Sequence, residues 1–485
     1  MNFLKKIISL SAFQIILSLI TIVICFLFFL QGDLIHTALS SYAYLQGHIT
    51  DFYEYNKLYL GGNDYLPTLY SIFALWNIPL HLLGLASYPT LEVFNGLHWN
   101  LLMQFPTAIE IAWWKTLLAL FYIGSVLVIH KIADLIESPH KTKSSLVSTL
   151  FATSPFVIFA VFIFSGYDVI SVFFTLLGFY YYLKKDIKRF IFFFAIAISC
   201  KYFAAILFFP LILMIEKRPI HITKLLILGA SVVALGLCFY WRSEIFREEI
   251  FNLMLHKIKG NPLQHTNLSE QLNLSISLIR FSFASLYIAA CIHIFFKRFK
   301  SKTEWQKYVV FMSLFTYALM FLLVKWHPQW SIIIAPFISL SYLFIKNKKF
   351  LSIFEIIAMF SFVCSLVIMY KFNVDVSMMT RSILKNILPR VLIINADLIP
   401  GMEFIWKYIS ILIFDFYLFL PLLILFYESR NSSKAKMTSP SQVLIVSRLI
   451  LGVSFLVIPS FICLFMPENW AHYINPDALM RLNNH

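Results

Sequence analysis

The chain has 485 residues, of which 60% are hydrophobic, 18% aromatic and only 13% charged, and its formal net charge is +15. Soluble domains are about 45–50% apolar and 25% charged, so this composition, with a mean hydropathy of +0.79, excludes a soluble globular protein and indicates a multi-pass membrane protein. The lysines and arginines stand in short clusters between apolar runs, which indicates a role in topology rather than nucleic-acid binding. The 6 cysteines lie within apolar runs and lack metal-ligand spacing, so we expect neither disulfides nor a metal site.

The N-terminus carries two lysines and then an apolar stretch to Leu30 without a small-x-small cleavage site, which we interpret as an uncleaved first span. Long apolar runs predict membrane-spanning helices at 8–30, 107–131, 145–164, 167–183, 222–241, 273–296, 307–325, 328–345, 350–370, 405–427 and 443–466. The stretches 66–86 and 190–215 are ambiguous. We therefore expect an all-α polytopic membrane bundle of about 11 to 13 spans.

The positions of the basic clusters decide whether the two ambiguous stretches cross the membrane. Basic clusters occur at 5–6, 131–143, 184–189, 216–224, 297–302, 346–349 and 428–436. If neither ambiguous stretch crosses, every cluster falls on the cytoplasmic side, as the positive-inside rule requires. The stretch 190–215 is then a re-entrant helical hairpin with Lys201 near its turn, in a cavity open to the outer side. The stretch 66–86 becomes an outer-face hairpin or half-helix with Pro67 and Pro79 as breakers, unless 66–106 holds two further crossings.

This topology gathers the polar segments on the outer face. They are the first outer loop 31–106, with its amphipathic helices, the loops 242–272 and 371–404, the tail from 467 and the short turn 165–168. Asp33 follows the first span by three residues, where partial desolvation raises the pKa of a carboxyl group and makes it a usable proton acceptor. The alternative is that Asp33 only marks the end of a helix.

The first outer loop carries a recognisable order of residues. Asp33 is followed by a helix rich in small residues, then Gly47, Asp51-Phe52-Tyr53 and Tyr65-Leu66-Pro67. This order resembles the first outer loop of the glycosyltransferase C superfamily, and it is most similar to the bacterial mannosyltransferase-like branch that uses polyprenyl-phosphate sugars. The family often has Tyr-Pro-Pro where this chain has Tyr-Leu-Pro.

Further segments resemble the same family in the same order along the chain. They are 162–185 with Asp168, 195–218 with Lys201 and Pro210, 267–281 with Arg280, and 324–337 with His327, Pro328 and Gln329. The resemblance covers roughly residues 8–345. It divides the chain into a transferase module, 1–345, and additional transmembrane helices in 346–485 that enclose the outer loop 371–404.

The resemblance implies transfer of a sugar from a polyprenyl-phosphate donor to a glycan, lipid or wall polymer on the outer leaflet of the cell membrane, with inversion at the anomeric carbon. Asp33 would be the general base, and Asp51 would help to position the base or the acceptor. The donor phosphate and sugar would be held by Lys201, Arg280, His327, Gln329 and Tyr65, with Asp168 tuning Lys201. A monophosphate donor requires no metal, and we expect no cofactor.

Structural alternatives remain open. Lys201 and Asp168 can form a purely structural pair, Arg280 can pair with an acid inside the bundle, and His327 can cap a helix. A flippase or exporter of lipid-linked glycans also needs cations for a phosphate but needs no base. An O-antigen-type polymerase is a second rival. Asp33→Asn separates these functions, because only a transferase that uses this base loses its activity.

Overall fold

The computed structural model describes residues 10–63, 65–88, 106–140, 142–250, 284–323, 328–370, 413, 416–424 and 426–428. Within these ranges the chain forms helices and no strand, which confirms the all-α class. The labelled elements are α2 (Leu10–Phe28), α3 (Gly32–Leu45), α4 (Phe52–Leu60), α5 (Pro67–Leu82), α8 (Ala108–Leu135), α9 (Ser144–Ala152), α10 (Pro155–Ile158), the π-helix η1 (Phe159–Ile163), α11 (Asp168–Leu183), α12 (Ile187–Cys200), α13 (Phe203–Ile215), α14 (Pro219–Gly229), α15 (Ser231–Tyr240), α18 (Lys302–Leu323), the 3-10 turn η2 (Pro328–Trp330), α19 (Ser331–Ser341) and α20 (Lys348–Tyr370).

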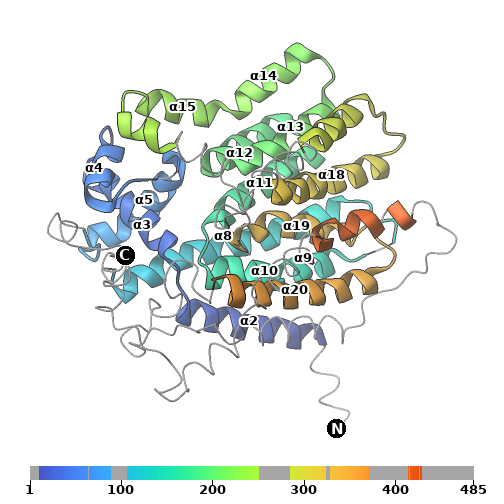
Figure 1. Ribbon diagram of the computed structural model, residues 1–485, viewed down its shortest axis with the longest axis horizontal. Helices are drawn as coiled ribbons and strands as arrows, with labels where there is room; N and C mark the ends of the chain where they lie inside the picture. Colours follow the sequence, from blue (N-terminus) through green and yellow to red (C-terminus); the bar gives the residue numbers. More distant parts are fainter. Residues whose placement is uncertain are drawn as a thin grey trace, which may run out of the picture.

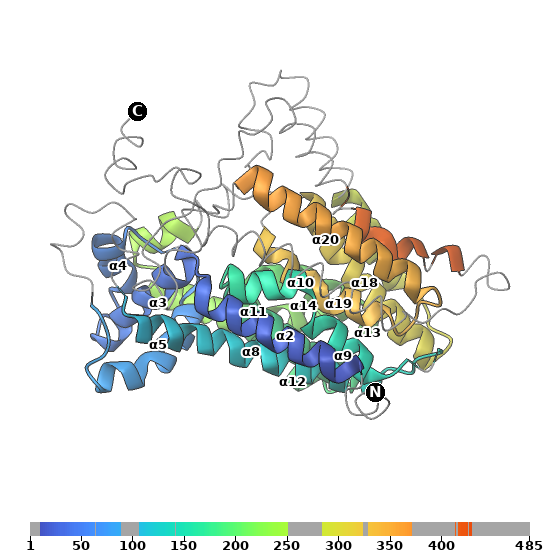
Figure 2. The same ribbon diagram turned by 90° about the horizontal axis from the view of Figure 1, so that it is seen from below.

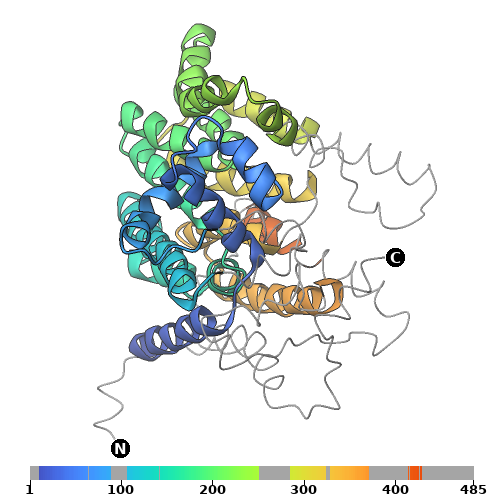
Figure 3. The same cartoon turned by 90° about the vertical axis from the view of Figure 1, so that its left-hand side faces the viewer.

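Two regions are visible in the fold. Long helices such as α2, α8 and α20 run in roughly the same direction through the bundle, and α3, α4 and α5 gather at one end of it (Figure 1, Figure 2). Figure 3 looks onto that end, with the blue α3–α5 region in front of the bundle. The described part of the first outer loop is therefore a small helical cap on one end of the bundle.

The cap contains the helices that the sequence predicts, with one error. Pro67 occupies the first turn of α5, where its missing N–H costs nothing. Pro79 does not break the helix, which runs on to Leu82. Only the last turn of α5 lies beyond Pro79, and Leu83 N–H still bonds to the Pro79 carbonyl at 3.0 Å, so the helix loses little by including it.

Polar contacts fasten the cap to the N-terminal half of α8. The Tyr42 hydroxyl in α3 donates to Glu110 at 2.8 Å, and Trp114 Nε1 donates to Asn77 Oδ1 in α5 at 3.0 Å. Glu110 also closes a capping box with Thr107 at the start of α8. Because these groups are buried and bonded, α3 and α5 have a fixed position on α8.

The helices α11, α12 and α13 fold back on one another. The ring of Phe208 in α13 lies 5.2 Å from the rings of both Phe190 and Phe194 in α12, measured between centroids. These residues flank the Lys201 break at similar distances along the chain, so α12 and α13 form a helical hairpin with Lys201 at its turn. Each arm is about 20 Å long at 1.5 Å per residue, which is shorter than the ~30 Å hydrocarbon core.

The basic clusters within the described ranges lie at one end of the bundle. Lys302, at the start of α18, pairs with Glu137 beyond the end of α8 at 2.8 Å. Trp305 stacks on Tyr182 near the end of α11, so the cluster 184–189 that follows α11 lies at this end too.

Two further contacts bring other clusters to the same end. Lys217 Nζ, beyond the end of α13, donates to the Ile294 carbonyl at 3.1 Å, close to the cluster that begins at residue 297. The Ser138 hydroxyl donates to the Leu343 carbonyl at 2.8 Å, three residues before Lys346. The N-terminus of α11 and the turn between α12 and α13 lie at the opposite end, which is the separation that the charge argument predicts.

The described helices test the number of spans only in part. One of them, Ala108–Leu135, is long and apolar enough to cross a membrane, and the number rises to four if each bent pair is a single span. The bends are 67° between α2 and α3, 45° between α9 and the α10–η1 segment, and 54° between α14 and α15. Because 443–466 and parts of 273–296 and 405–427 fall outside the described residues, the total of 11 to 13 remains a prediction.

Candidate functional site

A buried ion pair forms the centre of the candidate site. Lys201 Nζ lies 2.7 Å from Asp168 Oδ1, and the two side chains are only 4% and 5% exposed. Lys201 follows the last residue of α12, where the backbone turns from helical to extended. Asp168 is the first residue of α11, where the helix dipole favours a negative charge.

Two tyrosines enclose the lysine. Lys201 Nζ donates to the Tyr65 hydroxyl at 3.2 Å and lies 4.4 Å from the centroid of the Tyr65 ring. The Tyr167 ring centroid is 5.3 Å from the same nitrogen. A cation over an aromatic face gains about 0.5–2 kcal/mol. Lys201 is therefore held by one carboxylate, one hydroxyl and two ring faces.

Asp33 lies in the first turn of α3, and its side chain is half-buried. Its backbone N–H donates to the Gln31 side-chain oxygen at 2.6 Å, which caps the helix and fixes the start of α3. The second carboxylate of the site is thus presented, like Asp168, at a helix N-terminus, where the helix dipole favours a negative charge.

The electrostatics of the two tyrosines join Asp33 to the ion pair. Burial raises the pKa of the Tyr65 phenol, Lys201 lowers it, and the charges of Asp33 and Asp168 raise it again. The Tyr167 ring lies 5.3 Å from the Tyr65 ring, measured between centroids, and its phenol feels the charges of the same two carboxylates. The charges of Asp33, Asp168 and Lys201, which come from three distant parts of the chain, therefore all act on the Tyr65 phenol. The Tyr65 phenol stays protonated at neutral pH.

The turn before α11 contributes a residue that the sequence reasoning missed. Ser165 has a φ of +58°, a left-handed conformation that is costly for a residue with a Cβ. Its hydroxyl is buried and has no hydrogen-bond partner in the described part of the chain. No residue pattern in the sequence signals this strain, although the following Gly166 indicates a tight turn.

Gln329 packs beside this turn. Its Cβ lies 3.7 Å from the position of a Cβ built on Gly166, and the residue is 7% exposed. Its Oε1 has no hydrogen-bond partner among the described residues. A buried acceptor without a partner is rare in folded proteins and calls for a physical explanation. The structure thus places Gln329 next to the turn that precedes Asp168.

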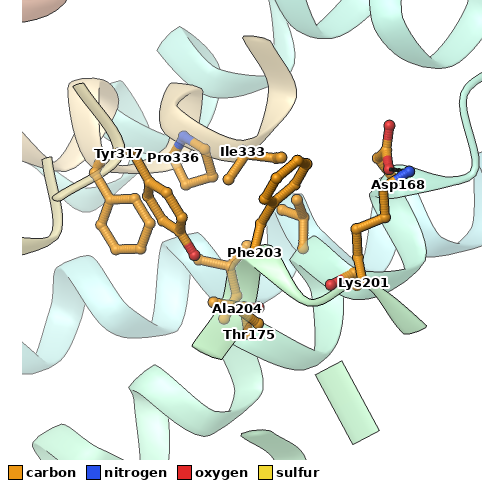
Figure 4. A pocket seen from close by; sticks show the side chains of 12 residues that line it. Asp168, Thr175, Lys201, Phe203, Ala204, Tyr317, Ile333 and Pro336 are labelled. Atoms are coloured by element: carbon orange, nitrogen blue, oxygen red, sulfur yellow. Dashed lines mark ion pairs between the residues drawn. The ribbon is translucent and has the colours of Figure 1, made fainter. Parts of the chain in front are cut away.

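A narrow cavity leads from the ion pair into the bundle between α11, α13, α18 and α19 (Figure 4). Asp168 and Lys201 form its charged end, and the remaining walls are largely apolar side chains such as Phe203, Tyr317 and Ile333. With a volume of about 10 Å³, the cavity has room for about one water molecule beside the ion pair. The described residues contain no group of three or more side chains that could hold a metal ion.

Asp51, a predicted site residue, is not part of this cluster. Asp51 precedes α4, its side chain is 54% exposed, and it pairs with His48 at 2.9 Å. His48 follows the C-terminus of α3, a helix about 21 Å long, whereas Asp33 lies at the N-terminus. The structure therefore does not bring Asp51 to Asp33. Arg280 and His327 lie outside the described residues.

Comparisons with known proteins add little. No protein-family model and no curated protein matches the chain. The chain is similar to the solved structure of ArnT from Cupriavidus metallidurans bound to undecaprenyl phosphate, with 11% identity and a TM-score of 0.44 over 92% of this chain and 76% of that chain. A similarity of this size assigns neither a family nor a function, so the family stays a resemblance of sequence motifs.

Proposed function

We propose that the chain is an integral-membrane glycosyltransferase that moves a sugar from a polyprenyl-phosphate carrier to an acceptor on the outer leaflet. The observation that carries the proposal is the buried Lys201–Asp168 pair at the end of the bundle opposite the basic clusters, together with Tyr65, which bonds to Lys201 and on which the charge of Asp33 also acts. The positive-inside rule supports an outer position for that end.

The proposed reaction is a direct displacement. Asp33 accepts the proton of the acceptor hydroxyl, and the hydroxyl oxygen attacks the anomeric carbon from the face opposite the phosphate. The bond between that carbon and the phosphate oxygen breaks, its electron pair stays on the polyprenyl phosphate, and the anomeric configuration inverts. The phosphate gains one negative charge, which the Lys201 ammonium stabilises.

Charge balance requires more than the described cluster. Asp33 and Asp168 contribute two negative charges and Lys201 one positive charge, so these three groups carry a formal net charge of −1. A donor phosphodiester adds another negative charge, which in a low-dielectric site needs further cations nearby. Arg280 and His327 are the candidates for this role.

Transfer assays test the proposal. Purified protein is incubated with radiolabelled polyprenyl-phosphate sugars and a membrane lipid extract, and labelled products are separated from the donor. We expect one sugar to be transferred and Asp33→Asn to lower the rate by about 10²–10⁴-fold, as loss of a general base does. Asp134→Asn, a surface carboxylate in α8 at the basic end, is the matched control and should keep the rate.

Two results would contradict this function. The first is the absence of transfer from every donor in the panel. The second is full activity of Asp33→Asn. Movement of intact donor across vesicles without any labelled product would support the flippase instead.

A further inference from the structure

Lys115 is a buried cation held by backbone carbonyls. It lies in α8 and is 1% exposed. Its ammonium donates to the carbonyls of Phe26 at 2.6 Å, Cys25 at 3.2 Å and Phe162 at 3.4 Å, and also to that of Phe29. It makes no ion pair with a carboxylate in the described ranges.

These carbonyls belong to two separate segments. Cys25, Phe26 and Phe29 form the last turn of α2 and the residue just beyond it, where the helix dipole attracts a cation. Phe162 belongs to η1, which packs against α2. One ammonium therefore ties the end of α2 to η1.

Both segments lead directly into the candidate site. Asp33 follows Phe29 by four residues, and Asp168 follows Phe162 by six. The junction between α2 and α3 is sharply bent, at 67°, and the turn after η1 contains the left-handed Ser165. Asp33 and Asp168 thus each follow a short irregular segment. Each segment begins at a residue whose carbonyl accepts a hydrogen bond from Lys115.

The backbone of Lys115 is held in place by its neighbours in α8. The preceding residue, Trp114, is fully buried and bonded to Asn77 in α5, and Glu110 one turn earlier is bonded to Tyr42 in α3. The Lys115 backbone therefore keeps its position relative to the cap. A lone charge at this depth is expensive, which argues for a specific role.

We propose that Lys115 is a positioning residue that sets the placement of Asp33 relative to Asp168 and Lys201. This inference rests on the proposed transferase function and deepens it. Lys115 touches no reacting group. It acts by holding the α2–α3 junction and the η1 turn together, so its loss lets the base move away from the acceptor hydroxyl. A displacement of about 1 Å at a reacting centre can cost about 10²-fold in rate.

The test compares two lysines of the same kind. Lys217 also donates to backbone carbonyls, those of Leu213 at 2.6 Å and Ile294 at 3.1 Å, but it lies at the basic end of the bundle. We expect Lys115→Met to lower kcat by about 10- to 100-fold while the Kd for undecaprenyl phosphate changes by less than about threefold. We expect Lys217→Met to leave kcat unchanged.

A double-mutant cycle tests whether Lys115 acts through Asp33. In the Asp33→Asn background, Lys115→Met should cost less than about threefold, because the base is already absent. Equal losses in both backgrounds would overturn the inference, as would an equal loss of kcat in Lys217→Met. If Lys115→Met does not fold, Lys115→Gln, which keeps donors for the carbonyls but not the charge, is measured in the same way.

Hydrogen exchange separates this inference from the proposed function. We expect Lys115→Met to speed amide exchange by about tenfold or more in 30–34 and 165–168, and Lys217→Met to leave both segments unchanged. Unchanged exchange in both segments would overturn the positioning role even if transfer is lost. If the wild-type protein transfers no sugar, the proposed function fails, whereas the exchange result still decides whether Lys115 orders the two segments.

Discussion

The Lys201–Asp168 pair makes a strong prediction about stability. The two side chains are 2.7 Å apart and almost completely buried, so solvent screens neither charge. Lys201→Met removes the cation at nearly constant volume and leaves the Asp168 carboxylate buried without it. Breaking a buried pair in this way costs about 3–5 kcal/mol of unfolding free energy.

The opposite change is expected to be milder. In Asp168→Asn the ammonium keeps the Tyr65 hydroxyl and the faces of Tyr65 and Tyr167, at 4.4 and 5.3 Å. Those ring contacts stabilise the unpaired ammonium by about 0.5–2 kcal/mol. We therefore expect Asp168→Asn to lower the free energy of unfolding by about 1–3 kcal/mol. The double variant removes both charges and should be more stable than Lys201→Met alone.

Equilibrium unfolding of the purified protein by sodium dodecyl sulfate in mixed micelles measures all three variants. We expect stability to fall in the order wild type, Asp168→Asn, Lys201→Met, with the double variant more stable than Lys201→Met. If Lys201→Met is as stable as Asp168→Asn, or if the double variant is the least stable of all, the carboxylate is not dependent on Lys201 and the account of this pair is wrong.

Three further predictions concern single residues. Ser165→Gly should stabilise the protein by about 1 kcal/mol, because glycine adopts a φ of +58° without strain, and a lower unfolding midpoint would contradict this. Gly178→Ala should cost about 1–3 kcal/mol, because the new Cβ would lie 2.5 Å from a ring carbon of Phe194 in the α11–α12 interface; unchanged stability would mean that this interface is looser than described. Asp51→Asn should change stability by less than about 1 kcal/mol, since its pair with His48 is exposed, and should slow transfer far less than Asp33→Asn does in the same radiolabel assay. Equal losses of transfer in Asp51→Asn and Asp33→Asn would mean that Asp51 takes part in the reaction.

The hairpin around Lys201 was predictable because a lone charge in an apolar run is informative. The distribution of basic clusters predicts that its turn lies on the outer side, and in the structure the turn carries the pair with Asp168. Lys115 is also a lone lysine in an apolar run, but the predicted span around it, 107–131, agrees with the positive-inside rule as a simple crossing. The topology therefore did not single Lys115 out. Three of its carbonyl partners lie 86 to 90 residues before it, and the fourth lies 47 residues after it in a π-helix, which no local pattern reveals.

Other features depend on tertiary context. Pro79 was expected to break a helix, but a proline near a helix end removes few hydrogen bonds. The expected span 328–345 contains α19, which covers only Ser331–Ser341. The left-handed Ser165 has no local propensity that favours it, since its strain is held by the packed segments around it. Asp51 fitted a family-like turn, but the length of α3 separates it from Asp33.

The most direct test of the central claim is an experimental structure of the protein with bound undecaprenyl phosphate. The account predicts the phosphate within about 4 Å of Lys201 Nζ, a distance at which an ion pair forms, with the carboxylate of Asp33 facing the same space. A phosphate bound at another place in the bundle, with Lys201 still enclosed by Asp168, Tyr65 and Tyr167, would contradict it.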